Sequence, residues 1–212
     1  MKGKLEFEYH IQANNNEEEK EINYYENTNT QVTDRTLEEY KSYLGLPLEN
    51  LRGKRVLDIG SGQKESFSKQ AAKFDIEVIS LSPDLNREEV REQLTKGLIN
   101  RFKWQKKSVA GVVQELPFED GVFDVEVSLF AFPFHIPESE IGLKKGFQEI
   151  IRTLKTGGTA YLYPIRGDQT GVIKAVLEDF SGAIEFKTEL VRGKEWEDGG
   201  QQEYRLTIHK NI

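Results

Sequence analysis

The sequence contains no cysteine. This absence excludes disulfide bonds, thiolate metal sites and cysteine nucleophiles. Histidine is nearly as scarce, and the three residues His10, His135 and His209 lie far apart in the chain. They do not have the spacing of a metal-binding motif, so we expect no bound metal ion.

Long hydrophobic runs are also missing. The first ten residues, Met1 to His10, are charged and lack the apolar core of a signal peptide. No apolar run reaches the length that a membrane-spanning helix needs. We therefore expect a cytoplasmic protein that does not enter a membrane.

Positive charge is in deficit, because 36 acidic residues outnumber 29 Lys and Arg and leave a net charge of -7. Proteins that bind nucleic acids usually present a basic face, so a nucleic-acid partner is disfavoured. Lys103, Lys106 and Lys107 do surround Phe102 and Trp104. A solvated loop or helix end with two buried aromatic side chains explains that local patch more simply.

The length of 212 residues suits one domain with an additional segment. Residues 1–50 are predicted to form an N-terminal extension, and residues 51–212 the main domain. Within the extension, Tyr24 and Tyr25 could belong to a lid over a ligand, or could equally pack the extension onto the body.

A helix is predicted near the end of this extension. Apolar residues recur with helical spacing between Leu37 and Leu46. Thr33 or Asp34 is the expected N-cap, and Gly45 and Pro47 are expected to end the helix.

From residue 52 onward, short apolar strands alternate with amphipathic helices, which predicts βαβ units and a parallel sheet. The last two strands have no helix between them and should form an antiparallel hairpin. We therefore predict an α/β fold with a doubly wound, seven-stranded, mostly parallel sheet and helices on both faces. The expected strands are residues 55–59, 77–81, 109–113, 123–130, 159–165, 183–191 and 203–209; the expected helices are 66–74, 87–98, 138–154 and 172–180, with Gly157 and Gly158 ending the third of these.

A glycine turn follows the first predicted strand, in the run Asp58-Ile59-Gly60-Ser61-Gly62. Glycine allows a sharp turn and a close approach of ligand to backbone, and free N–H groups at a helix start favour anionic or polar groups. An ordinary strand–turn–helix connection is the simpler alternative. A dinucleotide fingerprint would need a third glycine where Glu65 stands, so NAD is disfavoured.

Three stretches together resemble class I S-adenosylmethionine-dependent methyltransferases of the small-molecule type. The first is Val56 to Gly62, which is similar to the family's first motif. The second is Leu116-Pro117-Phe118 with Gly121 and Phe123 to Val125, and the third is Glu149 to Gly158, which resembles the "EI.RVLKPGG" stretch. Their order and spacing also match, over residues 52 to 165.

The resemblance implies a Rossmann-like methyltransferase domain that binds S-adenosylmethionine. By position, Asp58 would lie near the methionine amino group, and Leu129 would line the methionine through its backbone. The glycine turn would surround the methionine and ribose, and Val113 and Gln114 would lie beside the adenine. The implied cofactor-binding residues are Asp58, Gly60, Ser61, Gly62, Ser82, Asp84, Val113, Gln114 and Leu129.

Two positions depart from the family pattern. Ser82 stands where an acidic residue usually holds the ribose hydroxyls, although Asp84 follows two residues later. Val112 stands where an acid often faces the adenine amine. Each lost charged hydrogen bond is worth about 1.5–3 kcal/mol. A non-catalytic ligand-binding module on the same fold is therefore the main alternative, and a nicotinamide-dependent oxidoreductase is a remote one.

Methyl transfer depends chiefly on aligning donor and acceptor, so no obligatory catalytic constellation is expected. His135 follows the fourth predicted strand and is the candidate base, although a loop histidine without a role is the simpler interpretation. Arg166 could meet an anionic substrate or remain solvated. Glu126 lies within a buried strand, where a pairing with Lys or Arg is more plausible than a catalytic role.

Overall fold

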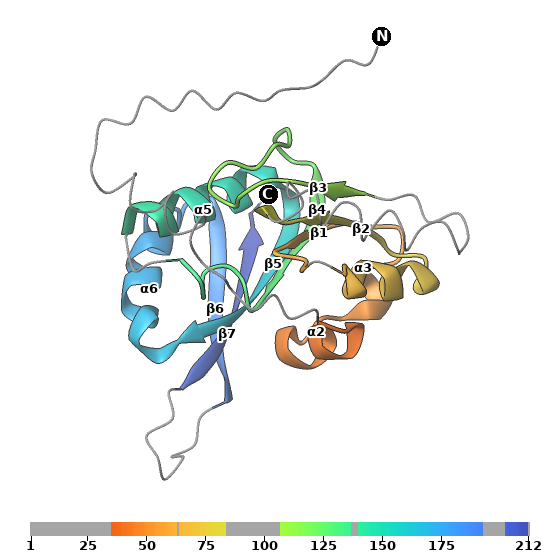
Figure 1. Cartoon of the computed structure of the whole chain (residues 1–212). Coiled ribbons are helices and arrows are strands. Elements are labelled where there is room, and N and C mark those ends of the chain that lie inside the picture. Colours follow the sequence, from red (N-terminus) through yellow and green to blue (C-terminus); the bar gives the residue numbers. More distant parts are fainter. Residues whose placement is uncertain (1–34, 63, 84–106, 137–139, 193–201, 212) are drawn as a thin grey trace. The chain divides into compact units, whose positions relative to one another are not determined.

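The computed structural model describes residues 35–62, 64–83, 107–136, 140–192 and 202–211. They belong to one compact unit, which runs from Val32 to Ile212. Seven strands form a single sheet in the order β3-β2-β1-β4-β5-β7-β6 (Figure 1). The strands are β1 (Arg55–Ile59), β2 (Glu77–Leu81), β3 (Ser108–Val109), β4 (Phe123–Leu129), β5 (Leu154–Arg166), β6 (Ile184–Arg192) and β7 (Glu203–Lys210).

The predicted mixture of parallel and antiparallel pairing is confirmed. Strand β1 pairs in parallel with β2 and β4, and the β2–β3 and β4–β5 pairs are parallel too. Strand β7 lies between β5 and β6 and is antiparallel to both. The strand order reverses at β1, because β2 lies on one side of it and β4 on the other. In open α/β sheets, ligands bind outside the carboxyl ends of the strands at such a reversal.

Helices cover both faces of the sheet, as predicted (Figure 1). The α2 and α3 helices pack against each other, and so do α5 and α6. In the part of the chain that the structure describes, no helix is long and apolar enough to cross a membrane. The helix expected at 87–98 lies outside the described residues. The helices are α2 (Leu37–Leu44), α3 (Ser66–Ala71), α5 (Glu140–Thr153) and α6 (Thr170–Glu178), with 3₁₀ turns at Leu48–Asn50, Ala72–Phe74 and Gly167–Gln169.

The start of α2 differs from the prediction. Its N-cap is Thr36, not Thr33 or Asp34. The Thr36 hydroxyl accepts the backbone N–H of Glu39, and the Glu39 carboxylate accepts the backbone N–H of Thr36. This reciprocal capping box satisfies two N–H groups of the first turn and is worth about 1 kcal/mol. Gly45 ends the helix in a left-handed conformation, as predicted.

The largest departures from the predicted bounds are at β3 and at the junction of α5 and β5. Strand β3 covers only Ser108–Val109, and the expected strand at 109–113 is instead a turn in which Glu115 N–H donates to Val112 O. Helix α5 ends at Thr153, and β5 begins at once with Leu154, before the glycine pair. Gly157, with φ 75°, lies where the β4–β5 register shifts, so this glycine bends a strand and does not end a helix.

Helix α2 shares one hydrophobic core with the sheet. Leu37, Tyr40 and Leu44 are buried in the same cluster as Val56 of β1 and Val127 of β4. Burial of large apolar side chains typically stabilises by about 1.5–3 kcal/mol each, so this helix is held firmly. The lid role suggested for residues 1–50, including Tyr24 and Tyr25, stays a prediction, and both tyrosines lie outside the described residues.

Candidate functional site

The glycine turn after β1 is a place where only glycine fits. Gly60 has φ 80°, in the left-handed region, and Gly62 has φ 72°. A Cβ atom on Gly60 would lie 2.2 Å from the Cβ of Ala131, in the loop after β4. The bare backbone of the turn thus approaches that loop closely. Any side chain at position 60 would push the two segments apart.

The N–H groups of this turn are arranged differently from the expectation. Gly60 and Ser61 both donate to the carbonyl oxygen of Leu81, at 2.8 and 3.1 Å. These two groups therefore fix the turn onto the end of β2 and are not free for a ligand. The polar side chains near the turn are therefore the remaining candidates for contact with a ligand.

Asp58 is the most unusual of those side chains. It is fully buried near the end of β1, and its Oδ1 accepts a 2.7 Å hydrogen bond from the hydroxyl of Tyr40. Its Oδ2 has no hydrogen-bond partner. Burial raises the pKa of Asp58 to about 7, the Tyr40 hydrogen bond opposes that rise, and the nearby negative charge of Glu65 adds to it. The carboxyl group is thus poised to gain or lose a proton near neutral pH.

A row of polar residues crosses the sheet beside Asp58. The strand register places Ser80 of β2 next to Asp58, and Ser108 of β3 next to Ser80. Ser80 is fully buried, and its hydroxyl oxygen has no hydrogen-bond partner. The Ser108 hydroxyl donates to the buried carboxylate of Glu65, which precedes α3. Buried polar atoms without partners are costly, and at this edge they indicate a place for a polar ligand.

The sequence did not predict this row. Glu65 was interpreted only as a departure from the dinucleotide fingerprint, and Tyr40 lay within the predicted helix without a role of its own. The missing information is the register between strands, which brings Ser80 and Ser108 into line with Asp58. Alternation along a single strand does not reveal which residue of a neighbouring strand lies opposite.

The predicted residues after β2 and β3 lie at the same edge. Ser82 directly follows β2, is buried, and donates its N–H to Val109 O at 3.2 Å. Val113 is buried and Gln114 half-buried in the turn after β3. The neighbouring position Val112 carries no acid, as the sequence showed, and Asp84 lies outside the described residues.

Arg152 of α5 holds the segment that follows this turn. Its guanidinium donates to the carbonyl oxygens of Phe118 and Leu116 and pairs with Glu149 and Asp120. The hydrogen bonds from Arg152 lower the pKa of Glu149 and keep it ionised, although its partial burial opposes this. The segment resembling "LPF" is therefore positioned by a charged network on α5, which the third resembling stretch supplies.

The end of β4 is tied to the end of β1. The hydroxyl of Ser128 donates to Ile59 O at 3.1 Å and accepts the N–H of Phe132 at 2.9 Å. Leu129 is buried, and Phe130 directly after it has φ 55°, a conformation rare for a bulky residue. These contacts turn the chain sharply at the carboxyl edge and set the direction of the loop that carries His135.

His135 is half-buried in the loop after β4. Its backbone N–H donates to Ala131 O at 2.9 Å. Burial lowers the pKa of the imidazole, and a hydrogen bond to the backbone of Phe130 opposes this. A ring N–H that donates to a carbonyl fixes one nitrogen as the donor, so the other nitrogen of a neutral imidazole is an acceptor.

The remaining predicted charges lie apart from this edge or are already paired. Arg166, at the end of β5, donates to Asp168 at 3.2 Å. The fully buried Glu126 accepts a 2.6 Å hydrogen bond from Thr153, and burial raises its pKa well above the usual range, while Lys210 and Arg152 partly oppose this. The expected pairing with Lys or Arg is wrong: among the described residues no cation forms an ion pair with Glu126, whose Oε2 is buried without a hydrogen-bond partner. Among the described residues, no group of His, Asp or Glu could hold a metal ion.

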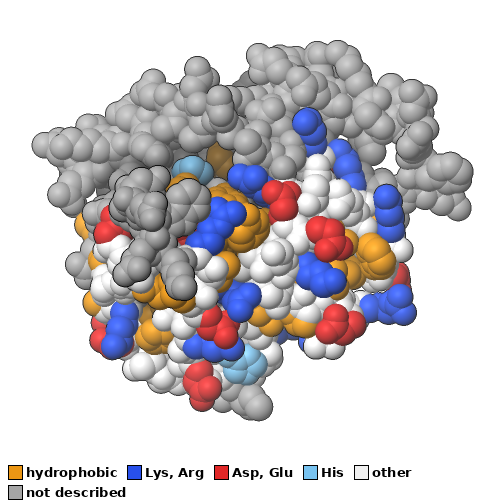
Figure 2. All heavy atoms as spheres, turned by 90° about the horizontal axis from the view of Figure 1, so that it is seen from below, with side chains coloured by type: hydrophobic (Ala, Val, Ile, Leu, Met, Phe, Trp, Pro, Cys, Tyr) orange, Lys and Arg blue, Asp and Glu red, His pale blue; other side chains and the backbone are white. Residues whose placement is uncertain are grey.

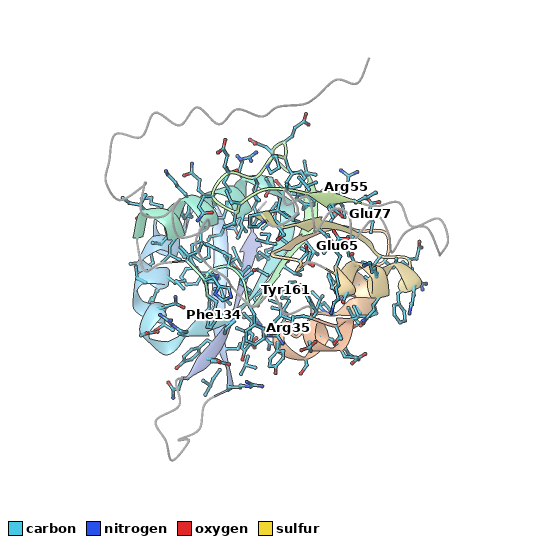
Figure 3. The ribbon with its side chains drawn as sticks, viewed as in Figure 1. Arg35, Arg55, Glu65, Glu77, Phe134 and Tyr161 are labelled. Carbon is cyan, nitrogen blue, oxygen red and sulfur yellow. The ribbon has the colours of Figure 1, made fainter. Side chains whose placement is uncertain are left out.

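Figure 3 shows the two ends of the strands. Arg55 and Glu77 begin β1 and β2 and form a 3.7 Å ion pair, whereas Arg35, beside α2, and Phe134 lie away from them. Asp58, the glycine turn, Ser82 and Leu129 come from three adjacent strands, β2, β1 and β4, and meet at the carboxyl edge. Val113 and Gln114 follow β3, the next strand of the same sheet.

Known proteins resemble this chain in sequence and in fold. The family model described as "Methyltransferase domain" matches residues 57–162. No curated protein of similar sequence was found.

Solved structures share the fold. A TehB-like S-adenosylmethionine-dependent methyltransferase from Corynebacterium glutamicum superposes with a TM-score of 0.54 at 17% identity, covering 92% of this chain and 98% of that one. A predicted O-methyltransferase from Agrobacterium tumefaciens gives 0.58 at 14% identity, covering 84% and 82%. An S-adenosylmethionine-dependent methyltransferase from Methanosarcina mazei gives 0.52 at 16%, covering 79% and 98%.

Proposed function

This chain belongs to the methyltransferase domain family, and we propose that it transfers a methyl group from S-adenosylmethionine to a small-molecule acceptor. The observation that carries the proposal is the glycine turn at the strand-order reversal, which begins two residues after the buried Asp58 and where a Cβ added to Gly60 would lie 2.2 Å from Ala131. Family membership favours an enzyme over the non-catalytic module.

The residues at this edge fit the methionine end of the donor. Asp58 Oδ2 is buried without a hydrogen-bond partner, and a carboxylate in that state is stabilised by an ammonium group. Gly60, Ser61 and Gly62 shape the adjoining surface, and the backbone at Leu129 borders it. Asp58 would therefore bind the donor's amino group, while the turn limits how far the donor can enter.

The adenosine end would lie towards β2 and β3. Ser82 and Asp84 follow β2, and Val113 and Gln114 follow β3, so we assign them to the ribose and the adenine. Since the usual acid is absent at position 82 and the Ser82 N–H already donates to Val109 O, the Ser82 hydroxyl would supply the polar contact there. The donor, when bound, supplies an electrophilic methyl group on a sulfonium sulfur.

His135 is the proposed base. Its lowered pKa keeps the imidazole neutral at pH 7, and its bond to the Phe130 backbone leaves one ring nitrogen able to accept a proton. The acceptor's nucleophilic atom would lose its proton to that nitrogen as it attacks. Alignment of acceptor and methyl group by the loop after β4 would supply most of the catalysis.

The surface agrees with a small acceptor. On the face seen in Figure 2, Lys and Arg side chains are interspersed with Asp and Glu, and no continuous basic area is visible there. With a net charge of -7, this arrangement disfavours a nucleic-acid substrate. We also propose that the protein is cytoplasmic.

Calorimetric titration with S-adenosylhomocysteine tests the donor site. We expect micromolar binding to the native protein. Gly60→Ala should weaken it by about tenfold or more, since φ 80° and the clash with Ala131 both oppose a side chain. The matched control is Gly171→Ala in α6, where an added Cβ meets nothing within 4 Å; its binding should be unchanged.

Thermal unfolding of each variant separates loss of the site from loss of the fold. No binding to the folded native protein at millimolar ligand would contradict the proposal and favour the non-catalytic module. Equal binding by native protein and a folded Gly60→Ala variant would show that the donor lies elsewhere.

A further inference from the structure

Four aromatic rings gather beyond the carboxyl ends of β4 and β5. The Phe130 ring lies 5.5 Å from that of Tyr43, 5.3 Å from Tyr163 and 6.2 Å from Phe134, in edge-to-face contacts. Tyr43 of α2 also stacks on Tyr163 of β5 at 5.0 Å. We call these four residues the aromatic cluster. Tyr163 is fully buried, but Tyr43, Phe130 and Phe134 keep part of their surface exposed.

Two arginines lie over this cluster. The guanidinium carbon of Arg35 is 4.4 Å from the centre of the Phe130 ring, and that of Arg192 is 5.1 Å from the centre of Tyr43. Arg192 also donates a 2.6 Å hydrogen bond to the Tyr43 hydroxyl. Contact with ring faces holds a guanidinium in one orientation, so both positive groups are positioned before any ligand arrives.

The positive charge on the cluster is only partly neutralised. Arg35 has one 3.3 Å contact with Glu39, and its Nε is buried with no hydrogen-bond acceptor. Among the described residues no carboxylate forms an ion pair with Arg192, although Glu203 lies opposite it in the register of β6 and β7 and accepts a hydrogen bond from the Tyr163 hydroxyl. A buried N–H without an acceptor is costly, and a planar anion bound at Arg35 would supply one.

The cluster adjoins the proposed base and donor site. Phe130 directly follows Leu129, the residue assigned to the methionine, and its backbone bonds the imidazole of His135. The Phe134 and His135 rings are 4.9 Å apart. A ligand on the cluster would therefore lie within reach of both the transferred methyl group and the base.

Building on the proposed function, we propose that the methyl acceptor is an aromatic acid whose carboxylate is held by Arg35 and Arg192 and whose ring packs against Phe130 and Phe134. Guanidinium forks match carboxylate geometry, and aromatic rings favour edge-to-face packing. For a phenolic acceptor, the oxygen forms a bond to the methyl carbon while the carbon–sulfur bond breaks. The phenolic proton passes to His135, and S-adenosylhomocysteine leaves with the electron pair of that bond.

The test compares acids with their neutral counterparts. The protein, saturated with S-adenosylhomocysteine, is titrated with 2-, 3- and 4-hydroxybenzoate and with hydroxynaphthoates. The corresponding hydroxybenzamides and hydroxynaphthamides are titrated in parallel. We expect at least one acid to bind about tenfold or more tightly than its amide. With S-adenosylmethionine, the same acid should yield a methyl ether, detected by mass spectrometry.

Arg192→Gln and Arg35→Gln should each remove most of the preference for acid over amide, while S-adenosylhomocysteine still binds as before. Lys174→Gln, which removes an exposed cation of α6, is the matched control and should keep that preference. If acids and amides bind equally, or no acid binds to a protein that binds S-adenosylhomocysteine, the acceptor assignment is wrong although the donor site stands. If S-adenosylhomocysteine itself does not bind, the proposed function fails first.

Discussion

Replacing Asp58 by Asn should stabilise the protein at neutral pH and impair donor binding at the same time. The carboxyl group is fully buried, and its pKa is about 7 in the folded protein against 3.8 for an ordinary Asp. Burial is the main cause, and the charge of Glu65 contributes. Oδ2 of Asp58 has no hydrogen-bond partner. The ionised carboxylate is therefore suited to bind an ammonium group, but its burial is costly when no ligand is bound.

The sign and size of the effect follow from proton linkage. Because the folded state keeps its proton to a higher pH than the unfolded state, stability is lost as the pH rises from about 4 to about 7. A shift of about three pH units corresponds to about 4 kcal/mol at most. Asn does not titrate and can still accept the Tyr40 hydrogen bond. We therefore expect Asp58→Asn to be more stable by about 2–4 kcal/mol above pH 7 and by little at pH 4.

Urea unfolding at several pH values between 4 and 8 measures this difference. The control is Asp124→Asn. Hydrogen bonds from the Arg55 backbone N–H and from Lys155, together with the positive charge of Lys155, lower the pKa of Asp124, although its slight burial opposes this. That variant should lose stability at neutral pH. A gain for Asp58→Asn that is the same at pH 4 and pH 8 would refute the reasoning, because the buried charge would then not be its origin.

Two further changes probe the supports of the site. Tyr40→Phe removes the hydrogen bond that favours ionised Asp58, so the pKa of Asp58 should rise. In calorimetric titrations, the pH at which S-adenosylhomocysteine binding is half-maximal should rise with it. An unchanged midpoint would mean that Asp58 does not bind the ligand. In Arg152→Lys, the lysine cannot reproduce the hydrogen bonds to Glu149 and to two carbonyl oxygens. Urea unfolding should therefore show a loss of about 1–3 kcal/mol in the free energy of unfolding. A loss below 0.5 kcal/mol, roughly the scatter of a surface substitution, would mean that Arg152 does not hold the segment after the 112–115 turn.

The local pattern of apolar and polar residues predicted most of the strands and helices. Strands β1, β2, β6 and β7 lie within a residue of their expected bounds, because short apolar runs between glycine, proline and polar residues have few alternatives. The errors fell where a turn competed with a strand. Val109 was placed in a strand of five residues, but the 112–115 turn shortens it, and Gly157 was taken for a helix end although it bends β5.

The sequence by itself determined the fold class and the position of the glycine turn, because both depend on residues that are neighbours along the chain. Tertiary structure alone decided that Tyr40 bonds Asp58, that Ser80 and Ser108 align beside it, and that Arg35 and Arg192 lie on rings from other elements. Those contacts join residues far apart in sequence. Strand register and helix packing set them, and neither can be read from periodicity.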